Sequence, residues 1–244
     1  MNNIFDRNIS LEEPGHKYIL KTDPAINFRS VTEIVSDYFE PFDKHAIAAN
    51  LVATNIKYMG TESSELIAKW DAARDYGTKI HKEIEDYLKE GKYPEEVKSV
   101  CAVEWLKKYQ MKSDVDIFSE IKVYSTELNI AGSIDILAHD KKADTYEVID
   151  WKTSKNIETK SYNNKMGTHP VTSNLQDCKF VHYSLQLSFY RYLLEQYYGL
   201  TINNQLIAHL KEDGCTGYVG RYYQKEVIDI IANQKNNKDQ SCHL

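Results

Sequence analysis

The sequence lacks the long apolar runs and the paired cysteines that would place it in a membrane or in a disulfide-rich class. No stretch of about 18 consecutive apolar residues occurs, and the polar start of the chain, residues 1–3, does not resemble a signal peptide. None of the four cysteines forms a CxxC pair; they are Cys101, Cys178, Cys215 and Cys242. Widely spaced cysteines predict free thiols in a reducing compartment rather than a zinc knuckle. We therefore expect a cytoplasmic protein with no membrane partner.

An excess of positive charge is also missing, because the formal net charge is −6. A negative balance argues against a broad basic surface. Lysines nevertheless gather where acids are few, at Lys152, Lys155, Lys160, Lys165 and Lys179. Such a segment is either a solvated loop or one groove that binds nucleic acid in a salt-sensitive way. The 18 tyrosines are equally compatible with base stacking and with a polar core.

The order of helical and strand patterns predicts an α/β (α+β) fold. No internal repeat or linker rich in proline, glycine or serine divides the chain, so we expect a single domain over 1–234. Within it, 1–110 should be mainly helical and 111–234 should form the sheet core, a small mixed sheet flanked by helices. The polar tail 235–244 should be disordered.

Periodicity and capping signals set the expected elements. The expected helices span 30–38, 64–90, 95–109, 181–198 and 225–233. A broken helical region is expected at 43–55. The expected strands span 116–126, 129–139, 145–153, 204–211 and 216–223. A short hairpin around 16–20 precedes them, and the loop 155–177 is long enough to suggest a function.

Two acids on neighbouring strands form the most informative feature of the chain. Asp135 ends Gly-Ser-Ile-Asp, and Asp150 follows the apolar Val-Ile pair 15 positions later. Side chains at i and i+2 share a face of a strand, so Asp150 and Lys152 should face one site while Trp151 points away. Buried like charges are costly unless a cation neutralises them. The alternative is an ordinary Asp–Lys salt bridge on a solvated face.

Three further segments add polar residues to this pair. His81 and Glu85 lie four positions apart on an expected helix, so both project from one face. Glu120 opens the strand segment Glu-Ile-Lys-Val. Gln186 and Tyr190 share a helical face directly after the lysine-containing loop. Imidazole and carboxylate together suit Mn²⁺ or Mg²⁺.

The combined segments resemble the PD-(D/E)XK nuclease superfamily, and specifically its RecB-like exonuclease branch. The matching stretches are GTKIHKEIE at 77–85, GSID at 132–135, DWKTSK at 150–155 and QLSFY at 186–190. The entry segment RSVTEI at 29–34 is also similar to phage and mitochondrial genome-maintenance exonucleases of this branch. The resemblance implies a restriction-endonuclease-like core, hydrolysis of DNA with Mg²⁺ or Mn²⁺, and a role in replication, recombination or repair. It also implies recombination or replication proteins as partners, in a bacterial or phage-infected host cell.

The resemblance also implies a role for each motif residue. The metal ligands would be His81, Asp135, Asp150 and the Trp151 backbone carbonyl, while Glu120 would ligate the metal or order its water shell. The catalytic group would comprise Asp135, Asp150, Lys152 and Glu85, with Glu85 at the edge of the site. The residues that position the DNA strand would be Gln186, Tyr190 and Lys155. Lys152 would orient the attacking water or stabilise developing negative charge.

Two departures from the family narrow the expected cofactors. The cysteine spacing does not match the iron–sulfur cluster of some relatives, so no cluster is expected. The absence of a GxxxxGK[ST] loop excludes the ATP use of helicase-fused relatives. Two other functions stay open: a structure-selective endonuclease, and a DNA-binding subunit with little cleavage activity. A metallohydrolase of another kind is disfavoured, because the chain has no HExxH motif.

Overall fold

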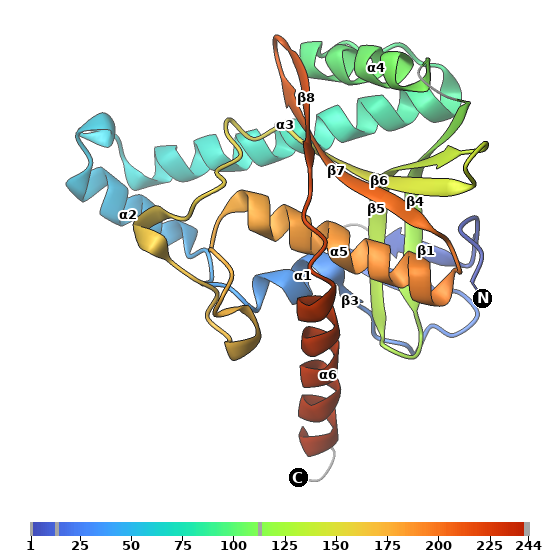
Figure 1. Cartoon of the computed structure of the whole chain (residues 1–244). Coiled ribbons are helices and arrows are strands. Elements are labelled where there is room, and N and C mark those ends of the chain that lie inside the picture. Colours follow the sequence, from blue (N-terminus) through green and yellow to red (C-terminus); the bar gives the residue numbers. More distant parts are fainter. Residues whose placement is uncertain (1, 13–14, 112–113, 242–244) are drawn as a thin grey trace.

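The computed structural model describes residues 2–12, 15–111 and 114–241. It contains a six-stranded mixed sheet with helices on both faces (Figure 1), which confirms the α/β class. The sheet strands are β3 (Arg29–Ser30), β4 (Val115–Ser125), β5 (Ile130–Asp140), β6 (Thr145–Lys152), β7 (Ile202–Lys211) and β8 (Gly214–Val219). The helices are α1 (Val31–Ser36), α2 (Lys44–Thr54), α3 (Ser63–Glu90), α4 (Val97–Gln110), α5 (Lys179–Tyr197) and α6 (Gln224–Ser241). Strands β1 (Ile9–Glu12) and β2 (Lys17–Leu20) form a separate antiparallel pair.

Local capping chemistry sets several of these boundaries. The side chain of Ser30 accepts a hydrogen bond from the backbone N–H of Glu33, and the Glu33 carboxylate accepts one from the backbone N–H of Ser30. This capping box starts α1 where the sequence predicts. Asp43 accepts hydrogen bonds from the first turn of α2, which is continuous rather than broken. Gly91, at φ 72°, ends α3 as expected.

The C-terminal helix extends further than the sequence predicts. The expected helix ends near 233 and is followed by a disordered tail from 235, but α6 continues to Ser241. No glycine or proline interrupts 224–241, and Lys235 pairs with Glu127 at 2.9 Å, so little opposes the longer helix. Residues 242–244 of the predicted tail lie outside the described residues, as does Cys242.

Alternating side chains divide the core between the two faces of the sheet. Helices α3 and α4 cover one face and α1 and α5 cover the other, while α6 extends away from the sheet (Figure 1). On β6, Val148 packs with the α1–α5 core, whereas Ile149 and Trp151 pack with the α3–α4 core. None of the helices in the described ranges has the length and apolar character of a membrane-spanning helix.

One edge of β5 is unpaired over a short segment, which is called the gap in β5 below. Strand β4 pairs with β5 from end to end except at Glu120 and Asp135, so β3 and β6 must share the opposite edge. There β3 pairs with 130–131 and β6 pairs with 136–140. The segment between them, 132–135, has no sheet partner on that edge. This segment is the Gly-Ser-Ile-Asp motif, so the topology opens the sheet where the sequence places its first acid.

Candidate active site

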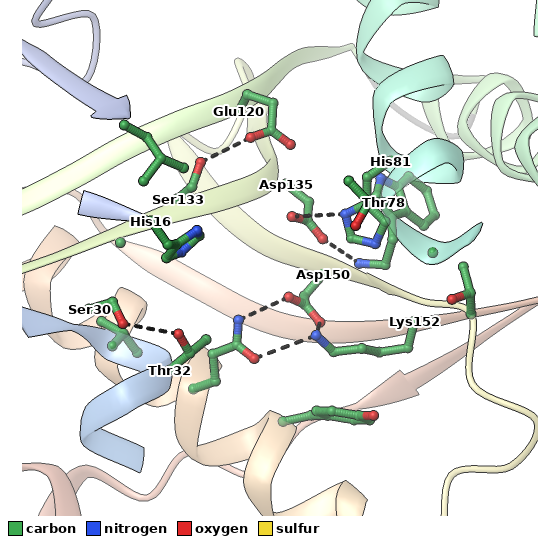
Figure 2. Close-up of a pocket in the computed structure, with 18 of the residues that line it drawn as sticks. His16, Ser30, Thr32, Thr78, His81, Glu120, Ser133, Asp135, Asp150 and Lys152 are labelled. Atoms are coloured by element: carbon green, nitrogen blue, oxygen red, sulfur yellow. Dashed lines mark hydrogen bonds and ion pairs between the residues drawn. The ribbon is translucent and has the colours of Figure 1, made fainter. Parts of the chain in front are cut away.

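A cavity of about 650 Å³ lies over the gap in β5. Residues from five parts of the chain line it: the β1–β2 hairpin, the start of α1, the middle of α3, strands β4 to β6, and α5. Figure 2 shows the polar side chains that face one another across it. The motifs that are far apart in the sequence therefore meet in one place.

A kink in two paired strands brings Glu120 next to Asp135. The β4–β5 pairing passes from Ser119–Ile136 to Ile121–Ile134 and omits the two acids between them. Glu120 has a left-handed φ of 54°, which is uncommon for a residue other than glycine. Across the kink Ile136 packs in the α3–α4 core and Ile134 in the α1–α5 core. The acids thus lie where the strands change face, at the boundary of the two cores.

His81 completes a cluster of three potential ligands with these acids. Its Nδ1 lies 3.5 Å from Oδ1 of Asp135, and ligand atoms of His81, Glu120 and Asp135 all lie within 4.8 Å of one another. The second carboxylate oxygen of Asp135, Oδ2, accepts a hydrogen bond from the backbone N–H of Trp151 at 2.7 Å. Glu120 accepts a hydrogen bond from the Ser133 hydroxyl at 3.0 Å. Each carboxylate is therefore oriented by one neighbour while an oxygen faces the cluster.

The pKa shifts in this cluster show unbalanced charge. Burial and the adjacent Asp135 carboxylate raise the pKa of Glu120. Burial opposes charge on His81, but Asp135 raises the pKa of His81 above its usual value. Burial likewise opposes the Asp135 carboxylate, but His81 and Lys152 hold its pKa below the usual value. Two half-buried carboxylates thus share one imidazole, so the cluster has more acidic groups than basic ones.

A divalent cation fits this cluster. Carboxylate oxygens and an imidazole nitrogen are a donor set that Mn²⁺ and Mg²⁺ accept. Burial and repulsion from Asp135 raise the pKa of Glu120, and a cation would offset that repulsion. The residues that would hold it are His81, Glu120 and Asp135, each of which comes from a different helix or strand.

Asp150 is neutralised in a different way within the same cavity. Its Oδ2 lies 2.6 Å from the Lys152 ammonium, and its Oδ1 accepts a hydrogen bond from the Gln186 amide at 3.2 Å. The carbonyl of Gln186 accepts from Lys152 at 3.5 Å, and its amide also donates to the Tyr190 hydroxyl at 3.0 Å. Burial raises the pKa of Asp150 to about 6, against the opposing charge of Lys152. Burial disfavours the charged lysine, but Asp150 raises the pKa of Lys152.

Aromatic rings fix the other side of this network. The Lys152 ammonium lies 4.5 Å from the centre of the Tyr183 ring, close enough for a cation–π interaction. Gly132 lies against the ring of Tyr190, and a Cβ at this position would overlap that ring. The glycine of the Gly-Ser-Ile-Asp motif thus lets α5 approach the open edge of β5. Gly77 has a similar role on the other side, since a Cβ there would lie 2.9 Å from the Thr153 hydroxyl.

All the predicted site residues except Lys155 line the cavity, and among those that do, Glu85 is paired with two lysines. Those that line it are His81, Glu85, Glu120, Asp135, Asp150, Trp151, Lys152, Gln186 and Tyr190. Glu85 lies between Lys89 at 2.6 Å and Lys82 at 3.2 Å. Burial opposes its ionisation, but these lysines hold the pKa of Glu85 below the usual value. Lys155 is exposed and does not line the cavity. Its predicted contact with DNA therefore has no support from its position.

The alternative of a solvated Asp–Lys pair does not fit this geometry. Asp150 is only 3% exposed, and its partner Lys152 lies among α5 side chains rather than at a free surface. The predicted orientations are confirmed, because Trp151 is buried in the α3–α4 core. Whether the Trp151 carbonyl and Asp150 are metal ligands remains a prediction.

Sequence reasoning missed several residues that line the cavity. Tyr183 lies three positions before Gln186 on α5, so the helical spacing that joins Gln186 to Tyr190 could have included it. The hydroxyls of Thr32 and Ser133 and the imidazole of His16 also line the cavity. Thr32 and Ser133 lie within the RSVTEI and GSID segments, but nothing in those segments singles out their hydroxyls. His16 lies outside every matched segment, and its placement depends on how the β1–β2 hairpin packs on β5.

Comparison with known proteins now identifies the family. The site combines buried acids and a lysine over an opening in a mixed sheet. The family model of the PD-(D/E)XK nuclease superfamily matches residues 44–206. This match covers more than half of the 244 residues, so the chain belongs to that superfamily.

Other comparisons add little to this assignment. A solved structure described as the crystal structure of SSO0001 is similar to this chain at 14% sequence identity and a TM-score of 0.35. That similarity covers 85% of this chain and 76% of the other. None of the curated proteins compared with this chain matches it.

Proposed function

We propose that this chain is a divalent-metal-dependent DNA exonuclease of the RecB-like branch, acting on single-stranded DNA or DNA ends. The observation that carries the proposal is the convergence of two groups in one cavity. His81, Glu120 and Asp135 offer ligand atoms within 4.8 Å of one another, and the Asp150–Lys152 pair at 2.6 Å lines the same cavity. Superfamily membership supports a nucleic acid as the substrate.

The cavity has an acidic half, formed by His81, Glu120 and Asp135, and a second half that contains the Asp150–Lys152 pair. Each half would contribute a different part of phosphodiester hydrolysis. A divalent cation, when bound by the acidic half, supplies Lewis acidity that activates water and stabilises charge on a phosphoryl oxygen. Lys152 has three N–H donors, of which Asp150 and Gln186 engage two. The remaining donor is available to orient the attacking water or to stabilise negative charge developing on the phosphate. Tyr183 and Gln186 hold the ammonium in place for either role.

The contacts of Gln186 suggest a different role from the one that the resemblance to the RecB-like branch implies. The resemblance implies that both position the DNA strand, but the amide of Gln186 is bound to Asp150 and to Tyr190. A glutamine is suited to this place because it donates to the carboxylate and accepts from the ammonium at once. We therefore assign Gln186 chiefly to positioning the acid–lysine pair. A contact of Tyr190 with DNA remains part of the proposal.

Digestion of end-labelled single- and double-stranded DNA with Mg²⁺ or Mn²⁺ tests the proposed function. We expect shortened products with either metal and none with chelator. Asp150→Ala and Lys152→Ala should abolish degradation while the circular dichroism spectrum stays that of a folded protein. Full activity in both purified variants would contradict the mechanism.

Further substrates separate the proposal from its two alternatives. Circular single-stranded DNA should stay intact with an exonuclease and be cut by a structure-selective endonuclease. Tight DNA binding in Mn²⁺ without product would instead favour a binding subunit with little cleavage activity. His81→Ala should act mainly by raising the metal concentration needed for half-maximal activity. A metal titration identical to that of the parent would remove His81 from the ligand set.

A further inference from the structure

The β1–β2 hairpin forms part of the cavity wall although it precedes the matched family segment. The family match begins at residue 44, and the hairpin spans Ile9–Leu20. Its residues Leu11, His16 and Tyr18 line the same cavity as the acids. The hairpin thus contributes to the site from outside the matched segment, and none of the motifs described above includes it.

A small core of its own holds the hairpin against the sheet. Ile9, Tyr18 and Leu20 are each at most 5% exposed, and they cluster with Phe28, Tyr124 and Ala131. Ala131 directly precedes Gly132, so the hairpin is anchored at the start of the gap in β5. The base of the hairpin is closed by a hydrogen bond from the Lys21 N–H to the Asn8 carbonyl at 2.8 Å. These contacts fix the position of the hairpin relative to the acids.

Two of the hairpin residues that line the cavity have polar groups, His16 and Tyr18, and of these Tyr18 is buried whereas His16 is exposed. His16 has a left-handed φ of 49° and follows Gly15 at φ 126°. Left-handed backbone at a residue other than glycine is sparsely populated and often occurs at ligand-binding positions. Figure 2 shows His16 across the cavity from His81, between Ser133 and the start of α1. Its backbone conformation places the imidazole over the open edge of β5.

The surroundings of His16 differ from those of His81. Hydroxyl groups border the cavity near it, and the Ser30 and Thr32 hydroxyls lie 3.1 Å apart at the start of α1. The Ser133 hydroxyl donates to Glu120 and marks the boundary with the acidic cluster. Hydroxyl groups and an imidazole ring carry no negative charge, so this region suits a phosphate oxygen better than the acidic cluster does. The cavity therefore has a third, uncharged region beside the acidic cluster and the Asp150–Lys152 pair.

We propose that His16 binds the substrate strand by donating a hydrogen bond to the phosphodiester next to the one that is cleaved. In this arrangement the hairpin is the wall along which the strand passes on the β3 side of the gap. Asp150 and Lys152 lie on the β6 side of the same gap. The inference rests on the proposed function, since it assumes a phosphodiester chain as the ligand.

Binding of oligonucleotides with one uncharged linkage tests this contact. The probes are fluorescent single-stranded DNAs that carry a single methylphosphonate at successive positions, titrated in Ca²⁺ and followed by fluorescence anisotropy. His16→Gly removes the imidazole and keeps a residue that adopts φ 49° without strain. Circular dichroism and thermal unfolding of the variant check that it keeps the fold of the parent. The matched control is His45→Ala on α2, which is exposed and does not line the cavity.

We expect His16→Gly to weaken binding of unmodified DNA about tenfold, as for loss of a hydrogen bond to a charged group. One methylphosphonate position should weaken binding to the parent and have no effect on binding to the variant. His45→Ala should match the parent with every probe. Equal methylphosphonate profiles for the parent and His16→Gly would overturn the inference. Cleavage by the parent would then still support the proposed function, so the two failures are distinguishable.

Discussion

The two halves of the cavity neutralise their acids in different ways. Glu120 and Asp135 lie beside each other at a strand kink with one imidazole close to both, and burial together with repulsion from Asp135 raises the pKa of Glu120. Asp150 instead has a lysine at 2.6 Å and an amide donor at 3.2 Å. The first group has two carboxylates and no lysine or arginine among its three members, whereas the second pairs its carboxylate with a lysine. From this difference we propose that the first group holds the metal and that Lys152 supplies a fixed positive charge beside it, while ligation by Asp150 remains a prediction.

The largest effect on stability and on cleavage should follow from removing one partner of the Asp150–Lys152 pair. Lys152→Met leaves Asp150 buried without its counter-ion, and removing one partner of a buried pair costs about 3 kcal/mol of unfolding free energy. DNA cleavage should fall at least about a thousandfold, comparable to loss of a key electrostatic group. Urea denaturation and initial cleavage rates measure the two effects.

A double variant separates the stability effect from the catalytic one. Asp150→Asn combined with Lys152→Met removes both charges, so most of the lost stability should return while cleavage stays absent. A double variant no more stable than Lys152→Met would show that the pair is not coupled as the distances indicate.

Removing a carboxylate from the cluster of His81, Glu120 and Asp135 should not lower the stability of the metal-free protein. Glu120→Gln relieves the repulsion with Asp135, so without metal the variant should be at least as stable as the parent. Mn²⁺ at a hundred times its Kd should stabilise the parent by about 2.7 kcal/mol, and Glu120→Gln should lose most of this gain. Thermal unfolding with and without Mn²⁺ measures both values.

The control for this experiment is Glu127→Gln. Glu127 pairs with Lys235 and does not line the cavity. Its Mn²⁺ response should equal that of the parent. An unchanged Mn²⁺ response in Glu120→Gln would remove Glu120 from the ligand set.

A single methyl group should disturb the contact between β5 and α5. In Gly132→Ala the new Cβ would overlap the ring of Tyr190, which must then move and release Gln186. Overpacking of this kind costs about 1–3 kcal/mol. We expect cleavage to fall about tenfold or more, since Gln186 would no longer be held against Asp150.

The matched control for the overlap is Gly217→Ala on β8. There a Cβ would lie 3.7 Å from Trp105, an ordinary contact distance. Both variants are compared by thermal unfolding and by cleavage rate. Equal behaviour of the two alanine variants would contradict the proposed role of the Gly132–Tyr190 contact.

The smallest effect is expected at the edge of the cavity. Glu85 is held between Lys82 and Lys89 and is not among the three clustered ligands. Glu85→Gln should therefore change the cleavage rate by no more than about threefold, as for loss of weak surface ion pairs. A loss comparable to that of Asp135→Asn would instead place Glu85 in the catalytic group.

Local signals made much of this arrangement predictable from the sequence. The capping box at Ser30, the left-handed Gly91 and the strand periodicity around Asp135 and Asp150 act over a few residues, so the pattern contains them. The i and i+4 spacing also placed Gln186 and Tyr190 in direct contact. Superfamily membership follows from these same segments and is confirmed.

The remaining features depend on contacts between distant segments. The kink at Glu120 follows from how β4 and β5 pass between two cores, and no residue pattern at 119–121 marks it. The placement of His16 depends on packing of the hairpin against Ala131. The helix α6 passes its predicted end partly because Lys235 meets Glu127, a residue more than a hundred positions away.

Anomalous diffraction from crystals soaked in Mn²⁺ tests the central claim most directly. The account predicts a peak bordered by His81 Nδ1 and the carboxylates of Glu120 and Asp135, with the Asp150–Lys152 pair still in contact beside it. A saturating soak that leaves this position without a peak, or shows Mn²⁺ only at other acids, would contradict the account.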